Sequence, residues 1–176
     1  MDGGPSSTRA EEDKKILGNG LPKYYATWNN TITYGNFDLT VTMRGAFGFQ
    51  LLNFQRMYSE NPGFTSYNQL LSSNDKIFGK AVLNSSVPVE YNSYYVENGD
   101  YWKIDNIQFG YSFPVSNVNH IKRAYLYIST LNTLIITNYK GMDPEVNRIG
   151  LNPGSDERYK FPSTRVYSLG INISFN

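Results

Sequence analysis

The chain has 176 residues, and its 2 Trp, 15 Tyr and 10 Phe make aromatic side chains 15% of the sequence. The 16 Lys and Arg residues almost balance the 15 Asp and Glu residues, so the net charge of +1 provides no long-range attraction for nucleic acid. Because cysteine is absent, disulfides, thiolate zinc sites and cysteine nucleophiles are excluded. The hydrophobic share of only 40% argues against a Leu/Ala-rich helical protein and favours a β-rich chain with long polar loops.

The N-terminal segment, residues 1–22, is polar and rich in Gly, so we expect a loop. Residues 1–15 lack the apolar core of a secretory signal peptide. No stretch approaches the roughly 18 apolar residues of a membrane helix. These features alone would indicate a cytosolic protein, but the strand pattern indicates a different location.

Alternation of apolar and polar residues predicts five strands, and Gly35 with Asn36 forms a two-residue hairpin turn between the first two. Segment 121–137 is β-rich but apolar on both sides, so its faces cannot be assigned from sequence. The segment between the second and third strands could hold a short helix around residues 67–71. The predicted strands cover residues 23–34, 37–49, 101–113, 121–137 and 163–175, and the predicted long loops are 50–100 and 138–162.

Three features of these strands favour a membrane barrel. Their length, about 11 to 13 residues, suits a tilted strand that crosses about 25 to 30 Å of hydrocarbon. Short connections alternate with long ones, as they do at the two ends of outer-membrane barrels. Aromatic side chains, which favour the headgroup level, recur near the strand ends. They are Tyr24, Tyr34, Phe37, Phe47, Phe49, Tyr101, Trp102, Phe113, Tyr167 and Phe175.

The predicted fold is therefore all-β: an antiparallel up-and-down sheet that forms the C-terminal part of a large transmembrane β-barrel. Short turns would be periplasmic, residues 1–22 would lie on the extracellular side, and the C-terminus would lie in the periplasm. Five strands cannot close, and an open edge in lipid leaves backbone groups unsatisfied. We therefore expect the chain to be part of something larger or a truncated product. A soluble β-sandwich that binds glycans is the alternative.

Candidate catalytic groups are few. His120 is the only histidine, and it lies in a short turn beside Asn119 and Lys122, so we do not expect a catalytic triad or a histidine metal site. The acidic run at residues 11–13 is interpreted as a solvated loop rather than a cation site. No phosphate-binding loop or nucleophile elbow is present. We predict no catalytic, cofactor-binding or metal residues, and no enzyme activity.

Asp143 and Glu145 flank Pro144, and paired carboxylates can act as acid and base. A structural turn is the simpler interpretation, because Asp before Pro fixes a turn. The first long loop is rich in aromatic residues, whose faces suit sugars or proteins, but we expect each ring to pack within the loop and assign no substrate residue. These residues are Tyr58, Phe64, Tyr67, Phe78, Tyr91, Tyr94, Tyr95 and Tyr101.

Several blocks of sequence resemble the SusC/RagA family of TonB-linked outer membrane proteins. The likeness runs in the family's order over nearly everything from Ile16 onward. The blocks are GNGLPKYY (18–25), WNN (28–30), GNFDL (35–39), YVENGDYWKIDNI (95–107), TNYKGMDPEV (137–146) and the closing strand that ends at Phe175.

The resemblance implies a share of a barrel of about 22 strands, filled by an N-terminal plug. Such proteins lie in the outer membrane of Gram-negative, Bacteroidetes-type bacteria. They import oligosaccharides or peptides with a SusD-like surface lipoprotein and are driven by TonB. The plug and the TonB-binding segment belong to a part of the family's proteins that this chain does not contain. We expect the chain to contact outer membrane lipid and the rest of the barrel, and no nucleic acid.

Two positions depart from the family's pattern. Family members commonly end on an aromatic residue, whereas Asn176 follows Phe175 here. An acidic loop that resembles a calcium motif in relatives is degenerate in residues 2–13, so no calcium site is predicted there.

Overall fold

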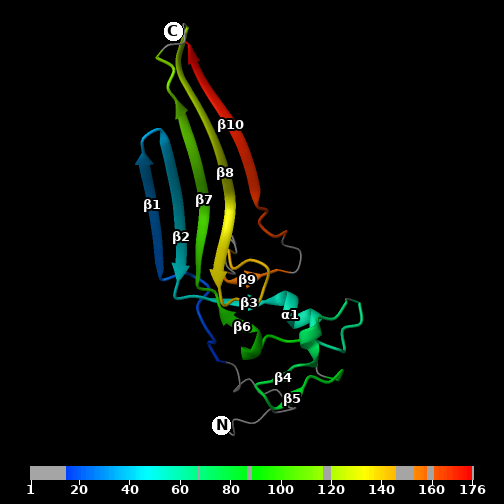
Figure 1. Cartoon of the computed structure of the whole chain (residues 1–176). Coiled ribbons are helices and arrows are strands. Elements are labelled where there is room, and N and C mark those ends of the chain that lie inside the picture. Colours follow the sequence, from blue (N-terminus) through cyan, green and yellow to red (C-terminus); the bar gives the residue numbers. More distant parts are fainter. Residues whose placement is uncertain are drawn as a thin grey trace.

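A computed structural model gives the fold of the chain and describes residues 15–66, 68–86, 89–116, 120–145, 153–157 and 161–175. Five long antiparallel strands form the main sheet in the order β1-β2-β7-β8-β10 (Figure 1). The prediction of an all-β antiparallel sheet is thereby confirmed. The strands are β1 (Tyr24–Tyr34), β2 (Phe37–Phe47), β7 (Tyr101–Phe113), β8 (Ile121–Thr137) and β10 (Val166–Phe175).

The ends of β2 and β10 differ from the predicted ranges. β2 stops at Phe47 rather than at residue 49, because Gly48 adopts a φ of +77° and its amide donates to Asp100 Oδ1 at 2.6 Å. β10 begins at Val166 rather than at residue 163. At the other end of β2, Gly35 has a φ of +59°, the left-handed conformation that a tight hairpin turn requires.

The predicted long loops 50–100 and 138–162 contain regular structure, so their interpretation as plain loops was wrong. Residue 67 of the predicted short helix lies outside the described residues, and residues 68–70 are not helical. A small sheet has the order β6-β3-β9, and β4 and β5 form a separate two-stranded sheet. The elements are β3 (Gln50–Asn53), α1 (Phe54–Ser59), η2 (Leu71–Asn74), β4 (Lys76–Ile77), β5 (Ala81–Val82), η3 (Ser93–Tyr95), β6 (Val96–Asn98) and β9 (Ser155–Asp156).

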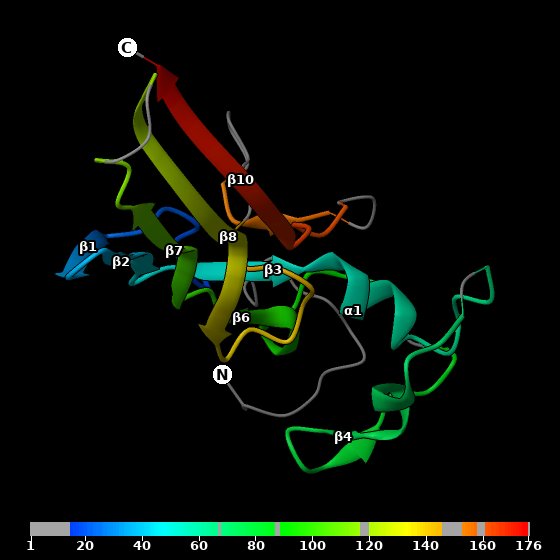
Figure 2. The ribbon, with the colours of Figure 1, turned by 45° about the horizontal axis from the view of Figure 1, so that its top comes forward.

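The small sheet lies at one end of the main sheet, where β2 ends and β7 begins (Figures 1 and 2). The turn at residues 35–36, the end of β7 at Phe113 and the end of β10 lie at the opposite end (Figure 1). The two kinds of connection are therefore segregated. None of the helices within the described ranges is long and apolar enough to cross a membrane.

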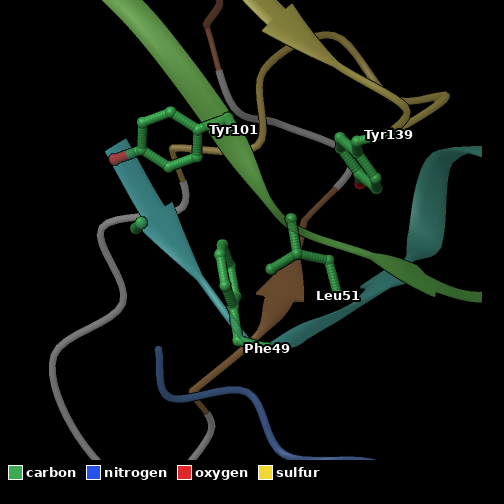
Figure 3. Packing of buried hydrophobic residues seen from close by; sticks show 5 residues of the cluster. Phe49, Leu51, Tyr101 and Tyr139 are labelled. Carbon is green, nitrogen blue, oxygen red and sulfur yellow. The ribbon is translucent and has the colours of Figure 1, made fainter. Parts of the chain in front are cut away.

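A compact core joins the two sheets. Phe49, just before β3, and Leu51 of β3 pack with Tyr101 of β7 and Tyr139, and all four residues are at most 8% exposed (Figure 3). Phe49 and Tyr101 meet edge to face, with ring centroids 6.5 Å apart. This core fixes the long connections against the end of the main sheet.

Candidate functional site: two faces of a sheet and a polar mouth

One face of the main sheet is apolar and uncovered. The strand registers align one residue of each strand in an apolar row that crosses the whole sheet. In this row Ile32 is 60% exposed, Ile128 55% and Leu169 73%, values far from those of a soluble core. The row consists of Ile32, Leu39, Phe109, Ile128 and Leu169.

Aromatic side chains border this apolar face at both ends. Toward the short turns, the Phe37 ring stacks on Phe109 and contacts Tyr111, with centroids 5.7 and 4.7 Å apart. Toward the small sheet, Phe47 stacks on Trp102 at 5.9 Å. Trp102 and Tyr111 are nine positions apart on β7, which is about 30 Å along the strand and about 23 Å along the normal at a barrel tilt of about 40°. That height matches the apolar band of a membrane barrel, about 25 Å.

Two of the aromatic residues predicted near the membrane interface are not on this face. Phe49 and Tyr101 are 4% and 8% exposed, because they belong to the core beneath the small sheet. The register pairs Tyr101 with Ala46, on the face opposite that of Trp102. Strand-end position alone could not separate these buried rings from the exposed ones.

The opposite face of the sheet is polar. Hydroxyl and amide side chains bond across neighbouring strands: Thr31 pairs with Thr40 at 3.1 Å, and Thr42 donates to Asn29 Oδ1 at 3.1 Å. Further along, the Tyr125 hydroxyl donates to Asp38 Oδ2 at 2.8 Å. In a barrel, side chains alternate between lipid and lumen, so this face would point to the lumen.

Four charged side chains form a cluster on the polar face near the small sheet. Lys103 Nζ lies 2.7 Å from Glu145 Oε2 and 3.8 Å from Asp105 Oδ1. Arg44 ion-pairs with Glu145 and, at 3.3 Å through Nε, with Asp105. The Lys103 side chain is only 4% exposed, so the two carboxylates provide the counter-charges that a buried ammonium group requires.

The family-like loop at residues 137–145 brings Glu145 to this cluster. Tyr139 N donates to Thr137 Oγ1 at 3.1 Å, and the Tyr139 hydroxyl donates to Asp156 Oδ2 at 2.6 Å. Asp143 Oδ1 accepts from Glu145 N at 2.9 Å, which forms the turn expected around Pro144. Asp143 and Glu145 therefore act in a turn and in an ion cluster rather than as a pair facing each other. Burial and the hydrogen bond to Asp156 both raise the pKa of Tyr139.

A buried charge network holds α1 to the small sheet. Arg56 donates to Glu60 at 2.6 Å and also pairs with Glu97, whose other oxygen accepts from Lys140 N at 2.8 Å. Asn53 Oδ1 caps α1 by accepting from Arg56 N at 3.0 Å. Burial of the guanidinium lowers the pKa of Arg56, but the hydrogen bonds to the two carboxylates outweigh it, so the pKa is raised. This network was not predicted, since α1 has only six residues, too few to show a helical period.

The aromatic residues of the first long connection that the structure describes pack against other rings, as expected. Tyr58 contacts Phe64 edge to face at 5.1 Å, and Phe78 contacts Tyr94 at 5.4 Å. Tyr67 lies outside the described residues.

The other residues that the sequence suggested as possible catalytic or metal-binding groups are not part of the charged cluster. His120 is exposed in the turn before β8, with a φ of +74°. Residues 2–13, which include the acidic run at 11–13, and Asn119 lie outside the described residues. Within the described part of the chain, no three His, Cys, Asp or Glu side chains gather as a metal site would require.

A long antiparallel sheet with one apolar and one polar face, aromatic borders and free edges on β1 and β10 is the arrangement of a segment of a transmembrane barrel wall. The relatives agree with this class of protein. An alignment of 182 positions, which covers 93% of the chain, gives 28% identity to TonB-dependent receptor P3 of Formosa agariphila. An alignment of 152 positions, which covers 81% of the chain, gives 30% identity to TonB-dependent receptor SusC of Bacteroides thetaiotaomicron. No family model matches the chain.

Solved structures show the same fold. The RagAB peptide importer in its open-open state superposes on 97% of the chain with a TM-score of 0.80 at 20% identity. Its closed-closed state superposes on 96% with a TM-score of 0.79. The resemblance to the SusC/RagA family of TonB-dependent proteins is thus confirmed along almost the whole chain. The chain spans 17% of the length of receptor P3, 14% of SusC and 19% of the RagAB chain.

Proposed function

We propose that the chain forms the C-terminal part of the barrel wall of an outer-membrane importer of the SusC/RagA type, which takes up oligosaccharides or peptides. The observation that carries this proposal is the uncovered apolar face between its two aromatic borders. An apolar surface of that height is stable against lipid and unfavourable against water. The similarity to TonB-dependent receptors and to a peptide importer supports both the setting and the transport role.

A soluble β-sandwich receives no support from the structure. A sandwich buries its apolar face against a second sheet about 10 Å away. Here Ile128 and Leu169 are more than half exposed, and the small sheet lies at the end of the main sheet (Figure 1). The relatives are named receptors and importers, which supports a transport rather than a catalytic role.

The two ends of the sheet would face opposite sides of the outer membrane. The short turns and the end of β10 face the periplasm. Residues 15–23 and the small sheet face outward, where a SusD-like surface lipoprotein would meet the importer. The edges of β1 and β10 pair with other strands of the barrel, because an unpaired edge in lipid is costly. TonB would act through the plug, a part of such importers distinct from this wall.

Membrane fractionation tests the proposal. Outer and inner membranes of the source bacterium are separated by density, and the outer membrane is then washed with alkaline carbonate. We expect the chain in the outer membrane, released by detergent but not by carbonate. Recovery in the aqueous fraction without detergent would overturn the membrane assignment.

Growth of a deletion strain on neutral oligosaccharide or peptide mixtures tests the transport role. Unimpaired growth on both mixtures would contradict it.

A further inference from the structure

A hollow of about 500 Å³ opens on the polar face, between the main sheet and the small sheet. Tyr25 and Thr27 of β1, Arg44 of β2 and Tyr101 of β7 contribute to its walls, and Glu145 closes one side. Its volume is within the range of small-molecule sites, about 300 to 1,000 Å³. In the proposed orientation it lies on the lumen side near the outer end of the wall.

Arg44 and Glu145 line this hollow, and together with Lys103 and Asp105 behind them they form a cluster whose charges neutralise one another. Arg44 and Lys103 carry two positive charges, and Asp105 and Glu145 carry two negative ones; each cation pairs with both carboxylates. A ligand with a free carboxylate or ammonium group would need an ion that lacks a counter-charge, and these four groups offer none. They still provide hydrogen-bond donors and acceptors, since the Arg44 side chain is 37% exposed.

An aromatic ring stands exposed at the same hollow. Tyr25 is 75% exposed and faces the polar side, because the register pairs it with Ala46, whose other neighbour is Tyr101. The adjacent Tyr24 is 68% exposed but pairs with Phe47 on the apolar face. An accessible ring face beside neutralised polar groups suits a ligand with one apolar face and a rim of hydroxyls.

We propose that this hollow is a binding subsite for a neutral sugar unit of the imported molecule, with the ring of the sugar against Tyr25 and its hydroxyls toward Arg44 and Glu145. The inference rests on the proposed function and narrows its substrate to neutral saccharides at this position. A peptide, whose termini carry charge, is the competing ligand that the experiment must separate.

The test measures equilibrium binding to the detergent-solubilised protein. The probes are fluorescently labelled neutral oligosaccharides of about two to six units, and peptides of similar size. Tyr25→Ala removes the ring, Tyr25→Phe keeps it, and Tyr24→Ala removes an equally exposed ring on the opposite face. We expect Tyr25→Ala to weaken oligosaccharide binding about tenfold, whereas Tyr25→Phe and Tyr24→Ala leave it within about twofold.

Each other result decides against the subsite. Equal weakening by Tyr24→Ala and Tyr25→Ala, or no weakening by Tyr25→Ala, overturns it. So does a protein that binds only the peptides, or neither probe. Because Tyr25 is exposed, its substitution should not prevent folding, and outer-membrane recovery of each variant checks this. If all variants are recovered in the outer membrane but Tyr25→Ala binds oligosaccharides as tightly as the unchanged protein, the subsite is refuted while the proposed importer function is not.

Discussion

The Tyr125 ring lies directly against Gly110 on the polar face, and its hydroxyl donates to Asp38 Oδ2 at 2.8 Å. A Cβ on Gly110 would overlap the Tyr125 ring and hydroxyl. The same arrangement recurs on the next strand pair, where the Tyr127 ring covers Gly170. The two tyrosine rings stack with centroids 5.8 Å apart. Tyrosines on β8 therefore fill the space that glycines leave on both neighbouring strands.

Gly110→Ala should consequently destabilise the protein by about 1 to 3 kcal/mol, because the added methyl displaces Tyr125 from Asp38. The measurement is the midpoint of urea unfolding in detergent. In the double variant with Tyr125→Ala, the methyl has room, so the effect of Gly110→Ala should shrink by more than half. Purely additive effects of the two substitutions would contradict this contact.

Two buried tyrosines should respond oppositely to removal of their hydroxyls. Tyr139→Phe loses the hydrogen bond to Asp156, which is 6% exposed, so we expect a loss of about 1 to 3 kcal/mol in the free energy of unfolding. The Tyr95 hydroxyl is buried and has no hydrogen-bond partner among the described residues. Tyr95→Phe should therefore be neutral or slightly stabilising. Equal losses in both variants would contradict the assignment of the two hydroxyls.

Alkaline pH should weaken the small-sheet end of the molecule. Burial raises the pKa of Tyr95 to about 12, above the value of about 10 for an unfolded tyrosine. Above about pH 10 the unfolded chain loses this proton while the folded chain keeps it, so stability falls as pH rises toward 12. The expected slope for this group is about 1.4 kcal/mol per pH unit. Urea unfolding at about pH 9 and pH 11 measures it, and Tyr95→Phe should remove this part of the slope. A slope identical in the variant would exclude Tyr95 as its source.

Glu145→Gln should destabilise the loop at residues 137–145 and leave Lys103 with only the more distant Asp105. Because the Lys103 side chain is 4% exposed, we expect a loss of about 1 to 3 kcal/mol. Proteolysis of the loop in intact outer membranes is the measurement, and faster cleavage is the expected result. Asp75→Asn, at an exposed position, is the matched control and should change nothing. Unchanged cleavage of the Glu145 variant would show that the cluster does not hold the loop.

The strands could be predicted from sequence because alternation persists wherever the ladder is regular, as it is over Val166–Phe175. It fails at two irregular points. In β7 the register shifts between Ile104 and Asn106, so the outward residues change from even positions to odd ones at Ile107. In β8, Tyr125 and Tyr127 are large rings on the polar face, placed there by glycines distant in sequence.

The charged cluster and the small sheet beside it were less predictable than the strands. The turn at Asp143 was expected from its Pro neighbour. The pairing of Glu145 with Arg44 and Lys103 was not, because these residues are 101 and 42 positions away. The small sheet combines β3, β6 and β9 from three distant segments, each too short to show a period. Long-range pairing of short segments leaves no local pattern to read.

A single charge on the apolar face separates a membrane-facing wall from a soluble sheet. Ile128 lies in the apolar row, between Phe109 and Leu169, and is 55% exposed, so in water Ile128→Arg would change stability by about 0.5 kcal/mol or less. Against the centre of a bilayer it should cost about 2 to 4 kcal/mol. Ser129→Arg places the same charge on the adjacent, polar-face position and should be tolerated. Unfolding of both variants in lipid vesicles measures the difference. A large cost confined to Ile128→Arg is the expected outcome, because lipid penalises only the face that touches it; equal small effects would mean that this face meets water.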